Sequence, residues 1–170
     1  MKGLLLTTGA LAAALSLAVG LNSALAANHS ASARVKVAVA SSGLGRVLVD
    51  GRGRTLYLFE KDKLGKSACT GQCASFWPPL IASGKPLATA GARASLLGTT
   101  KRGDGRLQVT YNHHPLYTFV KDTRKGQTTG EEVNAFGAEW YAVSAAGAKV
   151  EKNAATNSSG SDPAPGGYGY

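Results

Sequence analysis

The chain has 170 residues, of which 19 are Lys or Arg and 10 are Asp or Glu, so its formal net charge is +9 at pH 7. This length limits the chain to one small domain with terminal segments. The basic excess is typical of a solvated, soluble surface or of a surface for an anionic partner, whereas the absence of any recognised nucleic-acid-binding motif argues against DNA and RNA.

The first 26 residues have the pattern of a secretory signal peptide. A positive tip of Met1 and Lys2 is followed by an uncharged apolar run, and a small-x-small site ends at Ala26. We expect cleavage after Ala26, which lowers the net charge from +9 to +8 because Lys2 is lost. A retained membrane anchor is the competing interpretation. Cleavage predicts a periplasmic or secreted protein with no transmembrane segment in the mature chain.

The segments on either side of the domain are predicted to be flexible. Residues 27–33 form the expected mature N-terminus, and residues 153–170 form a tail rich in Ser, Gly, Pro and Asn. Such a tail cannot bury enough apolar surface to offset the entropy lost on ordering, so it is expected to be disordered. The folded domain is therefore expected at residues 34–152, which is long enough for a hydrophobic core.

Apolar runs in the domain have the alternation typical of β-strands. Pairs of such runs flank the sequences DGRG and NHH, and each pair predicts a hairpin. The sequence TGQCASFW, at 70–77, is compatible with one short helix that Thr70 caps and the following prolines end. In chain order, strands are predicted at 35–40, 46–50, 54–60, 79–82, 106–111, 115–120 and 139–144.

The chain repeats itself. Four residues recur 60 positions later in the same order, and a tryptophan follows each copy. The recurring pairs are Tyr57 and Tyr117, Phe59 and Phe119, Lys61 and Lys121, Asp62 and Asp122, and Trp77 and Trp140. This duplication predicts two similar units, at about 43–90 and 91–150. The expected fold class is mainly β: a small antiparallel domain of two duplicated hairpin-loop-strand units whose apolar faces cover each other, with room for one short helix.

The repeated motifs resemble a known family. The sequences YLFEKD and YTFVKD, together with CTGQCASFWPPL, SLLGTTKRGDG, VTYNHHPLYTF and AEWYAVSAAG, are similar to the bacterial secreted or lipoprotein repeat family with a Tyr-x-(Phe/Trp/Tyr)-x-x-Asp motif. The resemblance covers the chain from about Gly43 to Gly147. It implies an exported protein, in a family that is often lipid-anchored and has no established biochemical function. This chain lacks the lipobox cysteine of the anchored members.

Cys69 and Cys73 are the only two cysteines of the chain. In an exported protein such a pair predicts a disulfide, and Gly71 between them helps so short a ring to close. The loop-entropy relation gives roughly 2 kcal/mol of stabilisation for this ring. The alternative is a copper or thiol redox pair, because Cys-x-x-x-Cys with a distal histidine suits Cu(I). His113 or His114 could supply that ligand, although both more simply occupy a hairpin turn.

The motif aspartates, Asp62 and Asp122, each follow an aromatic strand and precede a turn with glycine. A short carboxylate in this position commonly accepts hydrogen bonds from the amides of the following turn. We expect that role for both, and a shared ligand or acid–base site is the alternative.

The aromatic residues of each motif alternate along a strand and are therefore expected in the core. Trp77 and Trp140 are expected to close the same core, with a groove for a sugar polymer or an apolar ligand as the alternative. Together with Lys61 and Lys121, the two tryptophans are the candidate binding residues.

Motifs for nucleophilic, phosphate-binding or zinc-dependent catalysis are absent from the sequence, and the adjacent Glu131 and Glu132 do not resemble a glycosidase pair. We therefore expect a non-enzymatic protein of the cell envelope, without a cofactor or a metal site. Two functions stay open. The first is a binding or interaction module for an anionic envelope polymer or a partner protein. The second is a periplasmic copper-binding or thiol redox protein that uses Cys69 and Cys73.

Overall fold

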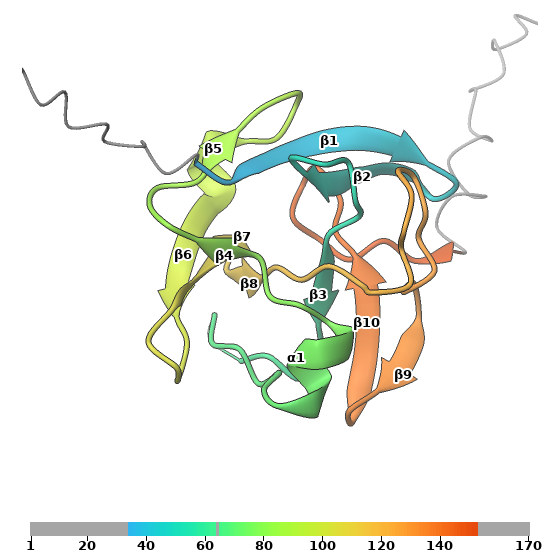
Figure 1. The fold of residues 1–170 in the computed structure, drawn as a ribbon. Helices are drawn as coiled ribbons and strands as arrows, with labels where there is room; N and C mark the ends of the chain where they lie inside the picture. The colour runs from blue at the N-terminus through green and yellow to red at the C-terminus, as the bar shows by residue number, and fades with distance from the viewer. Residues whose placement is uncertain (1–33, 64, 153–170) are drawn as a thin grey trace, which may run out of the picture. The chain divides into compact units, whose positions relative to one another are not determined.

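A computed structural model describes residues 34–63 and 65–152 (Figure 1). The predicted signal peptide, mature N-terminus and tail lie outside these residues. The described part contains ten strands and two short helices, so the predicted mainly β fold is confirmed. The strands are β1 (Lys36–Ser42), β2 (Gly45–Asp50), β3 (Tyr57–Phe59), β4 (Ile81–Ala82), β5 (Leu87–Ala88), β6 (Leu97–Lys101), β7 (Leu107–Tyr111), β8 (His114–Pro115), β9 (Val133–Ala135) and β10 (Ala138–Ala142).

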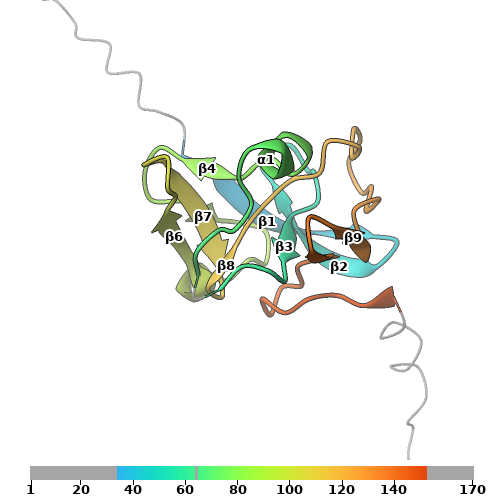
Figure 2. The same cartoon turned by 90° about the horizontal axis from the view of Figure 1, so that it is seen from below.

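The strands form three small sheets. In the first, β1 pairs with β2 antiparallel and with β5 parallel. The second has the order β3-β10-β9, and the third has the order β4-β7-β6 with β8 also on β7; all of their pairings are antiparallel. Figures 1 and 2 both show β6 on one side of the described domain, β9 on the other, and β3 between them.

The DGRG sequence after β2 forms a capped turn rather than a long hairpin. β2 pairs along its whole length with β1, whereas Val49 and Thr55 form an isolated bridge across the turn. Asp50 explains the turn, because its Oδ1 accepts hydrogen bonds from the amides of Arg52 (2.9 Å) and Arg54 (3.0 Å). The predicted pairing of 46–50 with 54–60 is therefore short, and β1 is the main partner of β2.

The NHH sequence does form a tight hairpin turn, between β7 and β8. Tyr111 and His114 pair across it, and the two residues between them, Asn112 and His113, have φ values of 47° and 68°. Positive φ at both central residues is the type I′ pattern, whose twist matches that of the flanking strands. β7 pairs with β6 over more residues than with β8, just as β2 pairs along its whole length with β1.

The last strand segment of each repeat pairs with the other repeat. The segment around β4, from the first repeat, lies against β7 and the motif strand of the second, and the end of β10 lies against β2 and the motif strand of the first. Equivalent backbone hydrogen bonds define this exchange. Leu80 N donates to Leu116 O (2.9 Å), and its equivalent is Val143 N to Leu56 O (3.1 Å). Val109 N donates to Leu80 O (2.8 Å), and its equivalent is Leu48 N to Val143 O (2.7 Å). The halves thus interlock, where the sequence predicted only that their faces cover each other.

The centre of the exchange is a direct pairing of the two motif tyrosines. The amide of Tyr57 donates to the carbonyl oxygen of Tyr117 (2.9 Å), and the amide of Tyr117 donates to the carbonyl oxygen of Tyr57 (3.0 Å). Because equivalent residues bond each other reciprocally, the two repeats are related by an approximate twofold axis at this pair.

The predicted short helix is present as α1 (Gln72–Phe76), a second turn being the 3-10 helix η1 (Ala94–Leu96). The predicted cap at Thr70 is wrong. Gly71 occupies the cap position with φ 55°, and no side chain caps the helix. Thr70 contributes its backbone carbonyl oxygen instead, which accepts a hydrogen bond from the amide of Cys73 (3.1 Å). None of the helices in residues 34–63 and 65–152 is long and apolar enough to cross a membrane.

Candidate functional site

The motif tyrosine of each repeat bonds the motif aspartate of the other. The hydroxyl of Tyr57 donates to Asp122 Oδ2 at 2.5 Å, and the hydroxyl of Tyr117 donates to Asp62 Oδ2 at 2.7 Å. Both tyrosine rings are buried, and Asp122 is buried while Asp62 is partly exposed. The repeated spacing of tyrosine and aspartate therefore ties the two repeats to each other, because neither pair forms within one repeat.

The second carboxylate oxygen of each aspartate holds the loop that follows it. Asp62 Oδ1 accepts from the amide of Ala68 (2.7 Å), and Asp122 Oδ1 accepts from both the amide (3.0 Å) and the hydroxyl (2.6 Å) of Thr129. These are bonds of the kind expected for a carboxylate at the end of a strand. Both aspartates thus have their oxygens engaged by the fold.

The electrostatics of the two pairs follow from burial. Burial and the neighbouring Asp122 carboxyl raise the pKa of the Tyr57 hydroxyl, so that Tyr57 remains a donor. Burial also raises the pKa of the Asp62 carboxyl to about 6, although the hydrogen bonds from Ala68 and Tyr117 and the charge of Arg102 act in the opposite direction.

The remaining motif aromatics and the two tryptophans form a continuous stack of four rings. Phe119 stacks on Trp77 (centroids 4.1 Å apart), Trp77 on Trp140 (4.0 Å) and Trp140 on Phe59 (4.0 Å). The stack alternates between the repeats, and its central pair is only 1% and 0% exposed, respectively. The candidate binding residues Trp77 and Trp140 therefore lie in the core, where burial of both ring faces against other rings leaves no open aromatic platform for a sugar.

Cys69 and Cys73 are joined in a disulfide, as the sequence predicted, and both are buried beside the ring stack. The disulfide joins the start of α1 to the loop before it. The second repeat has β9 in the corresponding place. Within residues 34–63 and 65–152, no group of three or more His, Cys, Asp and Glu side chains could hold a metal ion. The copper alternative would need the two sulfurs as free thiols.

Arg102 is a buried cation that sequence reasoning missed, because it stands in a polar, glycine-containing loop. Its guanidinium donates to Ser67 Oγ (2.8 Å), Gln108 Oε1 (2.6 Å) and the carbonyl oxygen of Cys69 (2.7 Å). These bonds tie the loop after Asp62 to the β6–β7 turn, so we assign Arg102 a structural role.

Glu131 is a buried carboxyl that the sequence also did not single out. Its Oε2 accepts from the amide of Ala142 (2.7 Å), whereas Oε1 has no hydrogen-bond partner. Burial raises the pKa of this carboxyl to about 7, and the charge of Glu132 acts in the same direction. Glu131 thus fixes the end of β10 at the cost of an uncompensated buried oxygen.

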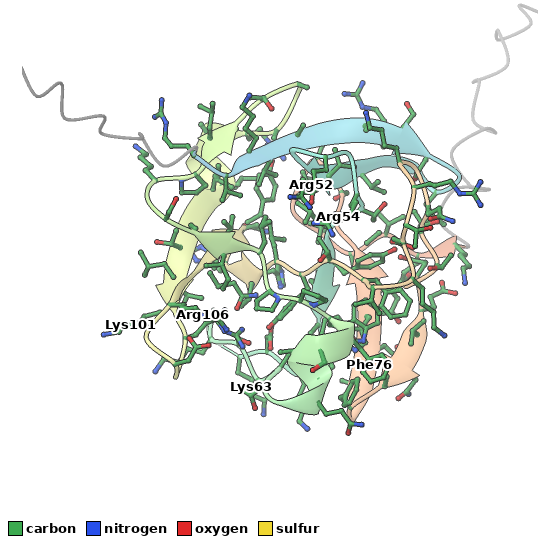
Figure 3. All side chains as sticks on the ribbon, in the orientation of Figure 1. Arg52, Arg54, Lys63, Phe76, Lys101 and Arg106 are labelled. Atoms are coloured by element: carbon green, nitrogen blue, oxygen red, sulfur yellow. A yellow bond between two sulfur atoms is a disulfide. The ribbon has the colours of Figure 1, made fainter. Side chains whose placement is uncertain are left out.

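A basic hollow lies where the turn after β2 meets the loop after Asp122. It has a volume of about 600 Å³ and draws its cations from both repeats. Figure 3 shows two of them, Arg52 and Arg54, beside β2. The residues that line this basic hollow are Arg52, Arg54, Val120, Asp122, Thr123, Arg124 and Lys125.

The cations of the basic hollow differ in how far they are neutralised. Arg54 forms an ion pair with Asp50, because its Nε (2.9 Å) and its Nη2 (2.7 Å) both donate to Asp50 Oδ2. Arg52, Arg124 and Lys125 are exposed, and no carboxylate of the described residues lies within ion-pair distance of them. Three cations therefore face solvent without a counter-ion from residues 34–63 and 65–152.

Two contacts hold the walls of the basic hollow together. The hydroxyl of Thr55 donates to the carbonyl oxygen of Gln127 at 2.7 Å. Gly53, with φ 82°, lies so close to Lys125 that a Cβ there would be 2.9 Å from its Cγ. The carbon chain of Lys125 therefore packs over the turn, which requires glycine for both its backbone conformation and this close approach.

Lys61 and Lys121, the other candidate binding residues, border an apolar hollow rather than the basic one. Lys121 lines this apolar hollow together with Phe76, Trp77, Phe119, Val133, Ala135 and Phe136. Lys61 Nζ donates to the carbonyl oxygen of Phe136 (3.1 Å). His113 and His114 lie in the β7–β8 turn, and burial, together with the neighbouring His113, lowers the pKa of His114.

Comparison with known proteins gives one match. A family model described as a secreted repeat of unknown function matches residues 38–81 and 98–144. The first match includes the motif of the first repeat and the second includes that of the second, as the duplicated sequence indicated. No curated protein and no solved structure matches the chain.

Proposed function

We propose that this chain, which belongs to the family of secreted repeats of unknown function, is a non-enzymatic protein of the cell envelope. We further propose that it binds an anionic component there. The observation that carries the proposal is the basic hollow. Arg52, Arg124 and Lys125 gather there without an ion pair to any carboxylate of the described residues, although Arg52 and Arg124 come from different repeats. Cations gathered in a concave site raise the local concentration of anions.

The chemistry of the hollow favours binding over catalysis. Its single carboxylate, Asp122, is engaged by Tyr57 and Thr129, so it has no free oxygen for general acid–base work. Arginine presents a planar fork of donors that matches phosphate, sulfate and carboxylate groups. We assign the hollow to one such group, or to successive groups along an anionic chain.

The alternative, a copper or thiol redox protein, has less support from the structure. It requires Cys69 and Cys73 as thiols, and the two are joined and buried. The disulfide holds α1, and its Cys73 is buried in the same core as Trp77.

The test is binding of the purified secreted protein to polyphosphate, a soluble linear polyanion, measured over a range of salt concentrations. Arg52→Gln, Arg124→Gln and Lys125→Gln together should weaken binding by roughly tenfold or more at about 0.15 M salt. The matched control removes the same charge from exposed lysines elsewhere: Lys63→Gln, Lys85→Gln and Lys101→Gln. Figure 3 shows Lys101 well away from Arg52 and Arg54.

The control decides between a site and a general charge effect. A specific hollow predicts that the control variant binds polyphosphate within about twofold to threefold of the unmodified protein. Equal weakening of both variants would mean that net charge alone attracts the polyanion, and the hollow would not be a site. Binding that ignores salt would also contradict the proposal.

A further inference from the structure

An exposed apolar patch lies beside the basic hollow. Phe76, Val120 and Phe136 are 42%, 44% and 37% exposed, which makes them three of the four most exposed large apolar side chains of the described residues. The rings of Phe76 and Phe136 are 6.1 Å apart at their centroids, and they flank the apolar hollow of about 250 Å³. Figure 3 shows Phe76 on α1. We call Phe76, Val120 and Phe136 the apolar patch.

The fold itself does not require apolar side chains at this place. Val120 N donates to Phe76 O at 3.1 Å, and the equivalent bond in the other half runs from Glu60 N to Glu139 O, also at 3.1 Å. The same pair of backbone positions thus carries Val and Phe at one end of the molecule and two carboxylates at the other. At that other end, Glu60 forms an ion pair with Lys149 at 3.1 Å.

The apolar patch and the basic hollow are parts of one surface. The segment 119–125, which turns at Val120 and Lys121, joins them: Val120 lines the basic hollow, and Lys121 lines the apolar one. On the far side of the patch, Lys61 is held at the carbonyl oxygen of Phe136. The apolar side chains are therefore bordered by cations on two sides.

An aromatic patch bordered by Lys and Arg has the composition of a surface that lies on an anionic lipid bilayer. Aromatic side chains enter the boundary between head groups and acyl chains, and lysine and arginine contact the phosphates. A soluble polyanion would use the cations and leave the phenylalanines in water. A second copy of the chain would bring the same cations face to face, which is repulsive.

We infer that the anionic component is the surface of an anionic lipid bilayer, on which Phe76 and Phe136 insert while the cations of the basic hollow contact lipid phosphates. This inference rests on the proposed function and names the ligand of the same site. It makes the protein a reversible peripheral binder of the membrane surface, held by two kinds of contact that can be removed separately.

The test uses vesicles of two compositions and the same secreted protein. One set contains phosphatidylcholine alone, and the other contains phosphatidylglycerol mixed with phosphatidylcholine; co-sedimentation measures binding. We expect binding to the anionic vesicles only. Phe76→Ser with Phe136→Ser should weaken that binding by roughly tenfold or more and leave polyphosphate binding unchanged. The matched control is Leu107→Ser, because Leu107 on β7 is 40% exposed and lies outside the patch.

A rescue variant tests whether misfolding, and not loss of the phenylalanines, explains weaker binding by the serine variant. Phe76→Leu with Phe136→Leu keeps the patch apolar, so it should bind the anionic vesicles within a few-fold of the unmodified protein. If the serine variant binds vesicles as well as the Leu107→Ser control does, the bilayer inference is overturned, while retained polyphosphate binding leaves the proposed function intact. Equal binding to both kinds of vesicle also overturns the inference. If the charge variant of the basic hollow keeps full affinity for polyphosphate, the proposed function itself fails.

Discussion

The motif strand and the last strand of the two repeats form equivalent backbone pairings, whereas the segments between the motif aspartate and the last strand have different structures. In the first repeat the chain continues through the Cys69–Cys73 disulfide and α1, and in the second it forms β9 and buries Glu131. The parts that the repeats share are the parts that they exchange: the motif tyrosine, the motif aspartate and the last strand. The parts in which they differ supply both phenylalanines of the apolar patch and two cations of the basic hollow, Arg124 and Lys125. Duplication therefore conserved the interlocking frame in this chain and left the surfaces free to diverge.

We expect the largest loss of stability from removing one ring of the central aromatic stack, to which both repeats contribute. Trp77→Ala and Trp140→Ala should each lower the free energy of unfolding by about 3–5 kcal/mol, because each deletes a fully buried side chain. Since both rings stack on the other tryptophan and on one phenylalanine, the two losses should be similar. Chemical denaturation measures both. A loss confined to one variant would mean that the stack is not shared equally by the two repeats.

A smaller change tests the exchanged tyrosine–aspartate pairs against each other. Tyr57→Phe should lower the free energy of unfolding by about 3 kcal/mol, at the upper end for an unsatisfied buried partner, because it leaves Asp122 buried without its donor. Tyr117→Phe should cost about 1 kcal/mol, because Asp62 is partly exposed and water can replace the hydroxyl. Equal costs would show that burial does not distinguish the pairs. Asp122→Asn in a double-mutant cycle with Tyr57→Phe would measure the coupling directly.

The disulfide belongs to the first repeat, so its loss should affect the halves unequally. Cys69→Ser with Cys73→Ser should lower the free energy of unfolding by roughly 2 kcal/mol, the value for closing so short a ring. Amide hydrogen exchange should accelerate in α1 more than in β9. Uniform acceleration would indicate that the disulfide supports the whole core. Reduction of the unmodified protein by dithiothreitol provides the matched comparison.

Glu131 belongs to the second repeat and should make stability depend on pH. A carboxyl whose pKa is raised to about 7 holds its proton more tightly when folded, so stability should rise as the pH falls from about 8 towards 5. The effect should be on the order of 1 kcal/mol or more. Asp62, with its pKa raised to about 6, adds to the same trend at the acidic end of this range. Glu131→Gln keeps the acceptor for Ala142 and should flatten the profile; an unchanged slope would contradict this assignment.

The sequence predicts most of the frame and little of the surface. The constant offset between the two motifs, which begin at Tyr57 and Tyr117, predicts the duplication. The alternation of apolar residues predicts that the motif aromatics lie in the core. Neither pattern says which repeat supplies the partner strand, because Leu80 pairs equally well in sequence terms with Leu56 or with Leu116. The basic hollow joins Arg52 to Arg124, two residues of separate loops that no local pattern connects. The burial of Arg102 cannot be predicted for a similar reason, since its partners Ser67 and Gln108 come from different elements.

The pairing of Leu48 with Val143 has a kinetic consequence. These two residues are separated by most of the folded domain, so the first repeat cannot complete its sheet until the last strand of the second repeat is available. Long-range pairings of this kind raise the contact order and slow folding. A ribosome-bound or partly translocated chain that ends before residue 143 would therefore have exposed strand edges in both repeats, and folding should begin only when nearly the whole domain has emerged.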